Sequence, residues 1–386
     1  MRKLGLILAI VMMCSFVVSP FAFGETIKIG FNIELTGDIP KVGEGSKYAA
    51  QMRLEELGGK LKVGDKTYDL QFIYEDNEAK AESAAAAATK LITSDEVLAI
   101  IGAQASKQAV PAGEICNNLQ TPMISPWSTN PATTQDRPYV FRACFLDPFQ
   151  GPVAANFATE EFGAKKAAVL YDIASDYPKG LAEFFKAAFE KIHGAGSVVA
   201  FETFTTKDRD FSAQLTKIVN SGADVLFTPQ YYDEVPLIVS QAHKLGWNKP
   251  ILGSDSWGSA ELVKLCGDDC KGLFFSTHYA AAGAKGATKE FIDKYNAKYG
   301  YIPDDVGALT WDAINIMLQA IQNTGGLTGD LQKDRDAVKD QLAQLKDFEG
   351  ITGKMTFTPE GDPIKCAVIV KISDQGEFEF YKSVCP

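Results

Sequence analysis

The sequence predicts an α/β protein built from two similar units, and three observations support this prediction. Short β-branched or aromatic segments alternate with helical patterns, which is typical of parallel sheets connected by crossover helices. The alternation occurs twice, from about residue 27 to residue 143 and from about residue 167 to residue 276. The chain of 386 residues is also long for a single hydrophobic core. Because no low-complexity linker separates the two units, we expect two lobes that face each other across a cleft.

The N-terminal segment has the layout of a cleavable secretory signal. A short basic start precedes the almost wholly apolar segment 4–18, which a Ser-Pro pair then interrupts. Ala22 and Gly24 place small residues where a signal peptidase reads the chain. The apolar segment is too short for a good membrane span. We therefore expect residues 1–24 to be removed, and the mature protein to lie in the periplasm without spanning a membrane.

Seven segments after the signal have the near-continuous apolar content of strands that are covered on both faces. They are 27–33, 70–74, 97–102, 167–171, 198–202, 224–228 and 272–276. Helical patterns stand between and after these strands, with apolar faces or alanine-rich stretches that end near glycines. The predicted helices cover 48–57, 79–93, 184–192, 305–324 and 331–345. The segment 147–152 lies between the two series and is the expected crossover from one unit to the other.

Charge and cysteine content narrow the class of protein. The net charge of −11 argues against nucleic-acid and anionic-membrane partners, whose phosphates require a basic patch. Cys14 belongs to the signal, and bulky methionines before it disfavour a lipoprotein cysteine. The six other cysteines form an even set, which in an exported protein indicates disulfides. Six cysteines allow 15 pairings, and the simplest joins chain neighbours: Cys116 to Cys144, Cys266 to Cys270, and Cys366 to Cys385.

Catalytic motifs are poorly represented. The chain has three histidines, His193, His243 and His278, and none stands in a motif with a nucleophile or a metal-ligand partner. We interpret each of them as a structural or surface residue. The serine spacing in 253–258 differs from that of a nucleophile elbow, and the Gly-Glu-Gly at 43–45 lacks the third glycine of a dinucleotide loop. We expect no catalytic residue, no metal and no cofactor.

Binding signals are stronger, and they stand at the ends of two successive strands. Residues 102–106 follow a buried strand and open a helix, with Ser106 as the expected N-cap. Free backbone N–H groups at a helix N-terminus attract a carboxylate or a phosphate. Residues 124–131 follow the next short strand and supply further hydroxyls, among them that of Ser128. In such sheets ligands bind beyond the carboxyl ends of the strands, so we expect an anion site here.

Further motifs run the length of the mature chain in a fixed order. They include 27–30 with 35–37, 101–106, 124–131, 140–142, 147–151, 210–212, 253–255, 311–313 and 348–353. In this order the chain resembles the type I periplasmic solute-binding proteins, in the leucine/isoleucine/valine-binding-protein-like family that serves ABC importers. The resemblance implies two Rossmann-like lobes with parallel-type sheets, joined by three crossovers. Lobe 1 would comprise 25–146 plus 277–355, and lobe 2 would comprise 147–276 plus 356–386.

The resemblance also implies a function and a set of binding residues. The protein would be a monomer that captures an amino acid between its lobes and delivers it to an ABC transporter permease. The ligand's carboxylate would lie at Ser106 and Thr129, and the carbonyl of Trp127 would face the ligand. Two tyrosines from the second lobe, Tyr177 and Tyr231, would complete the site. Asp255 would be the acid that pairs with the α-ammonium of the ligand. A buried zwitterion needs both of its charges satisfied, which such a site would provide.

Four features depart from the usual family pattern, and one of them is the Tyr-Pro-Lys-Gly at 177–180, which replaces the usual tyrosine-glycine opening. Asp255 is one methylene shorter than the common glutamate, Trp127 is bulky where a small residue is frequent, and Val42 replaces a frequent aromatic. We therefore expect an α-amino acid ligand whose side chain need not be branched and aliphatic. Three alternatives stay open: the same fold binding an amide, urea or aromatic carboxylate; a ligand-sensing subunit of a signalling partner; and an exported hydrolase.

Overall fold

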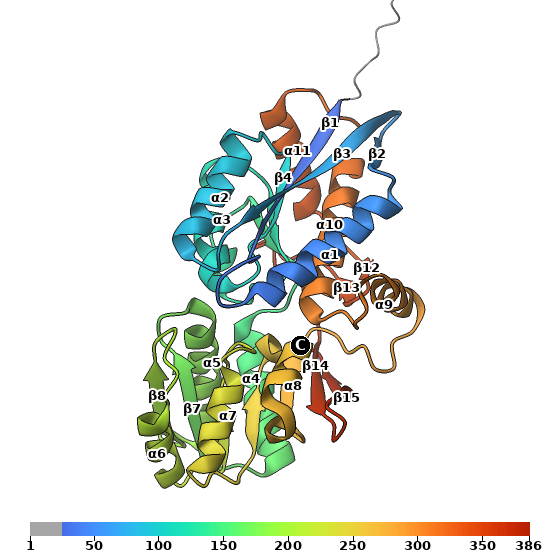
Figure 1. Cartoon of the computed structure of the whole chain (residues 1–386). Coiled ribbons are helices and arrows are strands. Elements are labelled where there is room, and N and C mark those ends of the chain that lie inside the picture. Colours follow the sequence, from blue (N-terminus) through green and yellow to red (C-terminus); the bar gives the residue numbers. More distant parts are fainter. Residues whose placement is uncertain (1–24) are drawn as a thin grey trace, which may run out of the picture.

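The computed structural model describes residues 25–386, so the predictions for the signal segment and Cys14 lie outside the described residues. Two lobes are stacked end to end, with α9 beside their junction (Figure 1). One lobe is built on a six-stranded sheet and the other on a seven-stranded sheet. A two-stranded hairpin, β12 (Phe348–Gly350) with β13 (Gly353–Met355), lies near the junction. The predicted class, α/β with two parallel-type sheets, is confirmed.

The six-stranded sheet has the order β2-β3-β1-β4-β5-β6, and every pairing except that of β2 with β3 is parallel. Its strands are β1 (Thr26–Ile33), β2 (Lys60–Val63), β3 (Lys66–Asp76), β4 (Ala99–Gly102), β5 (Met123–Ser125) and β6 (Val140–Arg142). Apolar residues of α1, α10 and α11 pack on one face and those of α2 and α3 on the other. These helices are α1 (Pro40–Glu56), α2 (Ala81–Thr93), α3 (Ser106–Asn118), α10 (Asp305–Asn323) and α11 (Leu331–Ala343).

The seven-stranded sheet has the order β15-β14-β11-β10-β9-β7-β8 and is parallel except at the β14 and β15 edge. Its strands are β7 (Ala167–Asp172), β8 (Val198–Phe204), β9 (Val225–Phe227), β10 (Ile251–Gly253), β11 (Phe274–Thr277), β14 (Ala367–Ile372) and β15 (Phe378–Val384). Helices α4 and α5 pack on one face, and α6, α7 and α8 pack on the other. They are α4 (Asp147–Phe162), α5 (Asp176–His193), α6 (Ser212–Asn220), α7 (Val235–Lys244) and α8 (Ala260–Cys266).

The chain passes between the lobes three times, as the resemblance implied. It leaves the six-stranded sheet after β6, returns after β11 to form α9 (Gly286–Tyr299) and α10, and crosses again between β13 and β14. Buried polar contacts connect these passages. Arg142 donates a hydrogen bond to Asp362 at 2.6 Å, and the buried ammonium of Lys365 donates one to the hydroxyl of Thr352. Because a lone buried charge is costly, these partners fix the crossing segments against each other.

Two of the three predicted disulfides are present. Cys266 bonds to Cys270, and Cys366 bonds to Cys385. The predicted bond between Cys116 and Cys144 is wrong, because both thiols are free and buried. Cys116 packs in the core between α2, α3 and the sheet, whereas Cys144 belongs to a different apolar cluster and donates to the carbonyl of Ser128 at 3.1 Å. Nearness along the chain therefore did not bring these two side chains together.

Candidate ligand site between the lobes

The first wall of the site is the start of α3. Ala105, and not the expected Ser106, is the N-cap residue, and no side chain caps the helix. The serine prediction was wrong by one position because Ser106 is already helical. Its Oγ instead accepts hydrogen bonds from the Ser128 hydroxyl at 2.9 Å and from the Asn130 N–H at 3.4 Å. The hydroxyl of Ser106 is thus held by the loop after β5 at the mouth of a helix N-terminus.

The turn before α3 is supported by a buried acid. Glu34 follows β1, and its Oε1 accepts hydrogen bonds from the backbone N–H groups of Gln104 and Ala105 at 3.1 and 3.2 Å. Burial raises the pKa of this carboxyl to about 7, while these backbone donors oppose the shift. Sequence analysis did not identify Glu34, since a single acid after a strand gives no pattern.

The loop after β5 brings Ser128 and Thr129 behind Ser106. The carbonyl of Ser128 accepts a hydrogen bond from Arg142 at 2.7 Å, and its hydroxyl lies 2.6 Å from that of Thr133. The hydroxyl of Thr129 is buried, and its polar neighbour is the buried carboxyl of Asp147, whose pKa it lowers against the larger effect of burial.

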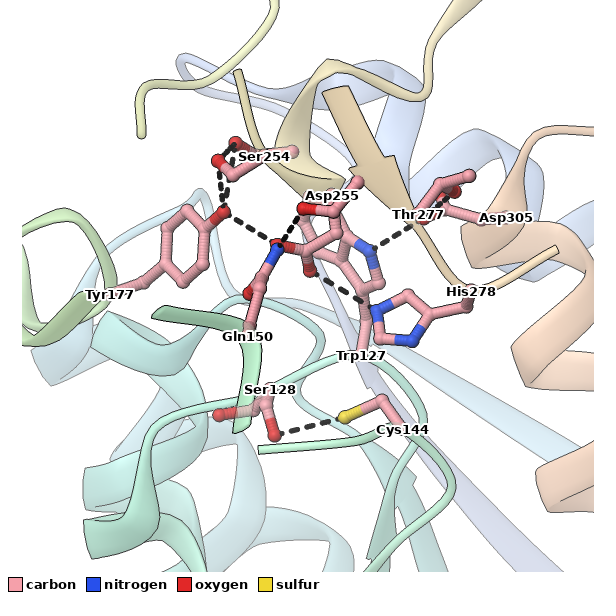
Figure 2. Close-up of polar contacts among 12 residues, drawn as sticks. Trp127, Ser128, Cys144, Gln150, Tyr177, Ser254, Asp255, Thr277, His278 and Asp305 are labelled. Atoms are coloured by element: carbon pink, nitrogen blue, oxygen red, sulfur yellow. Dashed lines mark hydrogen bonds and ion pairs between the residues drawn. The ribbon is translucent and has the colours of Figure 1, made fainter. Parts of the chain in front are cut away.

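The opposite wall is centred on Asp255, which begins a short 3₁₀ turn after β10 and is 1% exposed. Its Oδ1 accepts hydrogen bonds from the Tyr177 hydroxyl at 2.6 Å and from the Gln150 amide at 2.7 Å. Nε2 of His278 lies 3.2 Å from its Oδ2. Figure 2 shows these side chains converging on one carboxylate. Asp255 is therefore oriented by residues of α4, α5 and the segment after β11.

His278 and Gln150 are the residues that the sequence prediction missed. His278 is 1% exposed, its ring lies 3.9 Å from that of Phe145, and burial lowers its pKa below 6.5. The imidazole is therefore neutral at pH 7. His278 could have been identified from its position directly after a strand, at the same edge of the sheet as Asp255.

Aromatic side chains fill the space between the walls. The Trp127 ring lies 6.0 Å from that of Tyr231, which lies 5.5 Å from that of Tyr177. Nε1 of Trp127 donates to Oδ2 of Asp305 at 3.3 Å, as Figure 2 also shows. The Tyr231 hydroxyl is buried, and the side chain of Ser175 is its polar neighbour.

A pocket remains where these groups meet, with an empty volume of about 150 Å³. It is lined by Ala105, Ser106, Trp127, Tyr177, Tyr231 and Asp255. Five of the seven predicted site residues therefore share one pocket, and Ser128 and Thr129 lie in the loop behind Ser106. An adjoining hollow of about 400 Å³ shares Tyr231 and is lined by charged residues such as Lys107 and Asp172.

Two further buried acids surround Asp255. The pKa of Asp147 is raised well above its usual range by burial, and the charge of Asp255 adds to this. Burial likewise raises the pKa of Asp305, with the charges of Asp304 and Asp255 contributing. Both effects favour the neutral forms of Asp147 and Asp305.

The described part of the chain gives two further observations. Between residues 25 and 386, no three histidine, cysteine, aspartate or glutamate side chains gather in a way that could hold a metal ion. No helix in that same range is long and apolar enough to cross a membrane.

Comparison with known proteins gives the family. LivK, a leucine binding protein of Thermotoga maritima, is 33% identical with a TM-score of 0.86, over 93% of this chain and 99% of that chain. LivJ of Streptococcus pneumoniae, a branched-chain amino acid transporter substrate-binding protein in complex with isoleucine, is 32% identical with a TM-score of 0.84, over 94% of this chain and 100% of that chain. The leucine-, isoleucine-, valine-, threonine- and alanine-binding protein of Pseudomonas aeruginosa is 28% identical over 88% of this chain and 87% of its own length. Residues 26–377 match the family model described as periplasmic binding protein, and the chain belongs to that family.

Proposed function

We propose that this protein is an extracytoplasmic receptor that captures an α-amino acid between its lobes and delivers it to an ABC importer. One observation carries the proposal: a helix N-terminus from one lobe and an oriented carboxylate from the other line the same small pocket. A zwitterion has opposite charges on neighbouring atoms, and this pocket offers the complement of each. In this proposal the protein binds and releases its ligand without a chemical step, and it is not an enzyme.

The carboxylate of the ligand binds at the α3 end. Backbone N–H groups at a helix N-terminus and the hydroxyl of Ser106 are suited to an anion. Thr129 contributes its buried hydroxyl from the loop behind. The raised pKa of Glu34, about 7, reduces the negative charge beneath this helix start, which would otherwise repel the ligand's carboxylate.

The α-ammonium of the ligand binds at Asp255. Tyr177 and Gln150 donate hydrogen bonds to Oδ1 of Asp255, and the neutral His278 contacts its Oδ2. These contacts hold the carboxylate in one orientation without bringing a cation that would neutralise it. A desolvated ion pair with such support is strong enough to repay the burial of the ligand's charge.

The relatives support an amino acid as the ligand. Their names specify leucine, isoleucine, and a group that includes threonine and alanine. We assign the lobes as 25–146 plus 277–355 and 147–276 plus 356–386. Ligand binding closes the cleft by hinge motion, and the importer recognises the closed form of a periplasmic monomer.

Isothermal titration with a panel of amino acids, benzoate and urea tests the proposal. We expect heat from at least one amino acid. Asp255→Ala should weaken that binding by about 30-fold to 1,000-fold, because the ammonium loses its buried partner. Asp293→Ala is the matched control, since Asp293 is an exposed residue of α9 that pairs with Lys289. Binding of benzoate or urea alone, unchanged in Asp255→Ala, would contradict the proposal.

A further inference from the structure

A charged hollow adjoins the ligand pocket at Tyr231, whose side chain lines both spaces. The first turn of α3 also continues from one space into the other. Ser106 lines the pocket, and the next two residues, Lys107 and Gln108, line the hollow. On the opposite side, the hollow is lined by residues at and after the carboxyl ends of β7, β8 and β9. A ligand held between Ser106 and Asp255 therefore has this hollow beside it.

The lining of the hollow is predominantly acidic. Its charged residues are Lys107 and four acids, Asp38, Asp172, Asp233 and Glu234. The ammonium of Lys107 lies 3.5 Å from a threonine hydroxyl, and Asp233 lies 3.9 Å from an arginine outside the lining. Asp172 and Glu234 are buried, at 3% and 5% exposed, and neither forms an ion pair with a lysine or arginine of residues 25–386. Buried acids without a cationic partner are costly to the fold.

Hydrogen bonds hold these two buried acids in place without supplying a positive charge. Asp172 accepts a hydrogen bond from the Thr206 hydroxyl at 2.5 Å. The amide of Gln230, in the orientation that satisfies both of its ends, donates to Glu234 at 2.9 Å. Burial raises the pKa of Glu234 to about 8, and the charges of Asp233 and Asp172 add to this rise. A cation beside Glu234 would oppose both effects.

An unpaired acceptor on the α3 side of the hollow indicates the same kind of ligand group. Gln108 is 2% exposed, and its side-chain oxygen has no hydrogen-bond partner among the described residues. Buried polar atoms normally have a partner, and a carbonyl oxygen can be satisfied only by a donor. Within residues 25–386 no three acidic, histidine or cysteine side chains gather closely enough to hold a metal ion. The acceptors on the two sides therefore suit an organic cation.

We propose that the hollow receives the side chain of the ligand, and that the ligand is an α-amino acid with a cationic side chain, of the lysine, ornithine or arginine class. This inference rests on the proposed function, because the α-carboxylate and α-ammonium must be held at Ser106 and Asp255. The side chain extends past Tyr231, and its cation lies between the Gln108 oxygen and the acids of lobe 2. It supplies the positive charge that Glu234 lacks.

Isothermal titration with matched pairs of ligands tests the charge of the side chain. The pairs are lysine with norleucine, ornithine with norvaline, and arginine with citrulline, and only the first member of each pair carries a side-chain cation. The wild type should bind at least one cationic ligand about tenfold or more tightly than its uncharged counterpart. Glu234→Gln removes a carboxylate at nearly constant size and should lower this ratio by about threefold or more. Glu290→Gln is the matched control, since Glu290 is an exposed residue of α9, and it should leave the ratio unchanged.

Each outcome decides a different point. Uncharged ligands that bind as tightly as their cationic counterparts overturn the inference and leave the proposed function intact. A wild type that binds no amino acid contradicts the proposed function as well. Thermal melting shows whether each variant folds, and a folded Glu234→Gln with an unchanged ratio overturns the role of the acids of lobe 2. If Glu234→Gln does not fold, Asp172→Asn removes the other buried charge and gives the same test.

Discussion

Asp255 is held by three donors, and the least expected of them is His278. The histidine is buried, and its Nε2 lies 3.2 Å from Oδ2 of Asp255. Two charged groups influence it, the carboxylate of Asp255 and the ammonium of Lys365, which oppose each other in their effect on its pKa. Burial exceeds both and lowers that pKa, so the imidazole is neutral at physiological pH.

This arrangement predicts that amino-acid affinity falls on acidification below about pH 6, where Glu34, whose pKa is about 7, already carries little charge. Below the lowered pKa of His278, the imidazole gains a proton and places a cation beside Asp255. The cation competes with the ligand's ammonium, so affinity should fall by up to about tenfold per pH unit in this range. In His278→Gln the amide can still donate to Asp255 but does not titrate, and its affinity should fall less steeply. Titration calorimetry between pH 4.5 and 7.5 measures both profiles, and identical profiles would contradict the role of His278.

At the residue scale, the two ends of the site differed in how far they could be predicted. Ser106 and Ser128 were found because each stands after a strand in a segment that supplies hydroxyls, whereas Trp127 and Thr129 came from the resemblance. The resemblance placed Asp255. Gln150 and His278 lie on separate elements, and only folding brings them to Asp255. Their roles depend on contacts more than 20 residues apart in the chain, which no local pattern records.

At the scale of elements, the start of α3 depends on a residue of another element. Glu34 follows β1, yet its carboxyl accepts hydrogen bonds from two backbone N–H groups of the turn that leads into α3. The strand and the helix were predictable from apolar content and propensity. The support between them was not, because hydrogen bonds from a buried acid leave no periodic signal.

Glu34 gives a prediction about stability. Its pKa rises from the ordinary 4.5 to about 7 on folding, so the folded state binds more protons between these values. The associated stability is fully present below pH 4.5 and is lost as the pH rises through 7, with a ceiling of about 3 kcal/mol. In Glu34→Gln this group no longer titrates. Denaturant unfolding at pH 5 and pH 8 should therefore show a smaller loss of stability in the variant than in the wild type, and an equal loss would refute this account of Glu34.

The antiparallel strands of the two large sheets were not predicted, and they share a cause. β2, β14 and β15 pair antiparallel and are not followed by crossover helices, so they stand outside the alternation that predicted the others. β2 and β15 are also edge strands with many exposed residues. Their apolar content is correspondingly broken, and the pattern typical of a buried parallel strand is absent.

At the scale of the whole molecule, the site depends on the way the lobes are joined. The three chain passages bring the carboxyl ends of β4 and β5 opposite those of β10 and β11. The βα repeats predicted two facing lobes, and the resemblance predicted the number of passages. The size of the remaining pocket could not be predicted, because it depends on where the Trp127 indole packs and on its hydrogen bond to Asp305.

The central claim is that the two lobes hold opposite charges of one ligand. The most direct measurement is titration calorimetry with three ligands: the amino acid that binds most tightly, its N-acetyl derivative and its amide. Each derivative lacks one of the two charges. The parent amino acid should bind, and each derivative should bind at least 100-fold more weakly, since each leaves either Asp255 or the α3 N-terminus without its partner. An N-acetyl derivative or an amide that binds as tightly as the parent amino acid would contradict the claim.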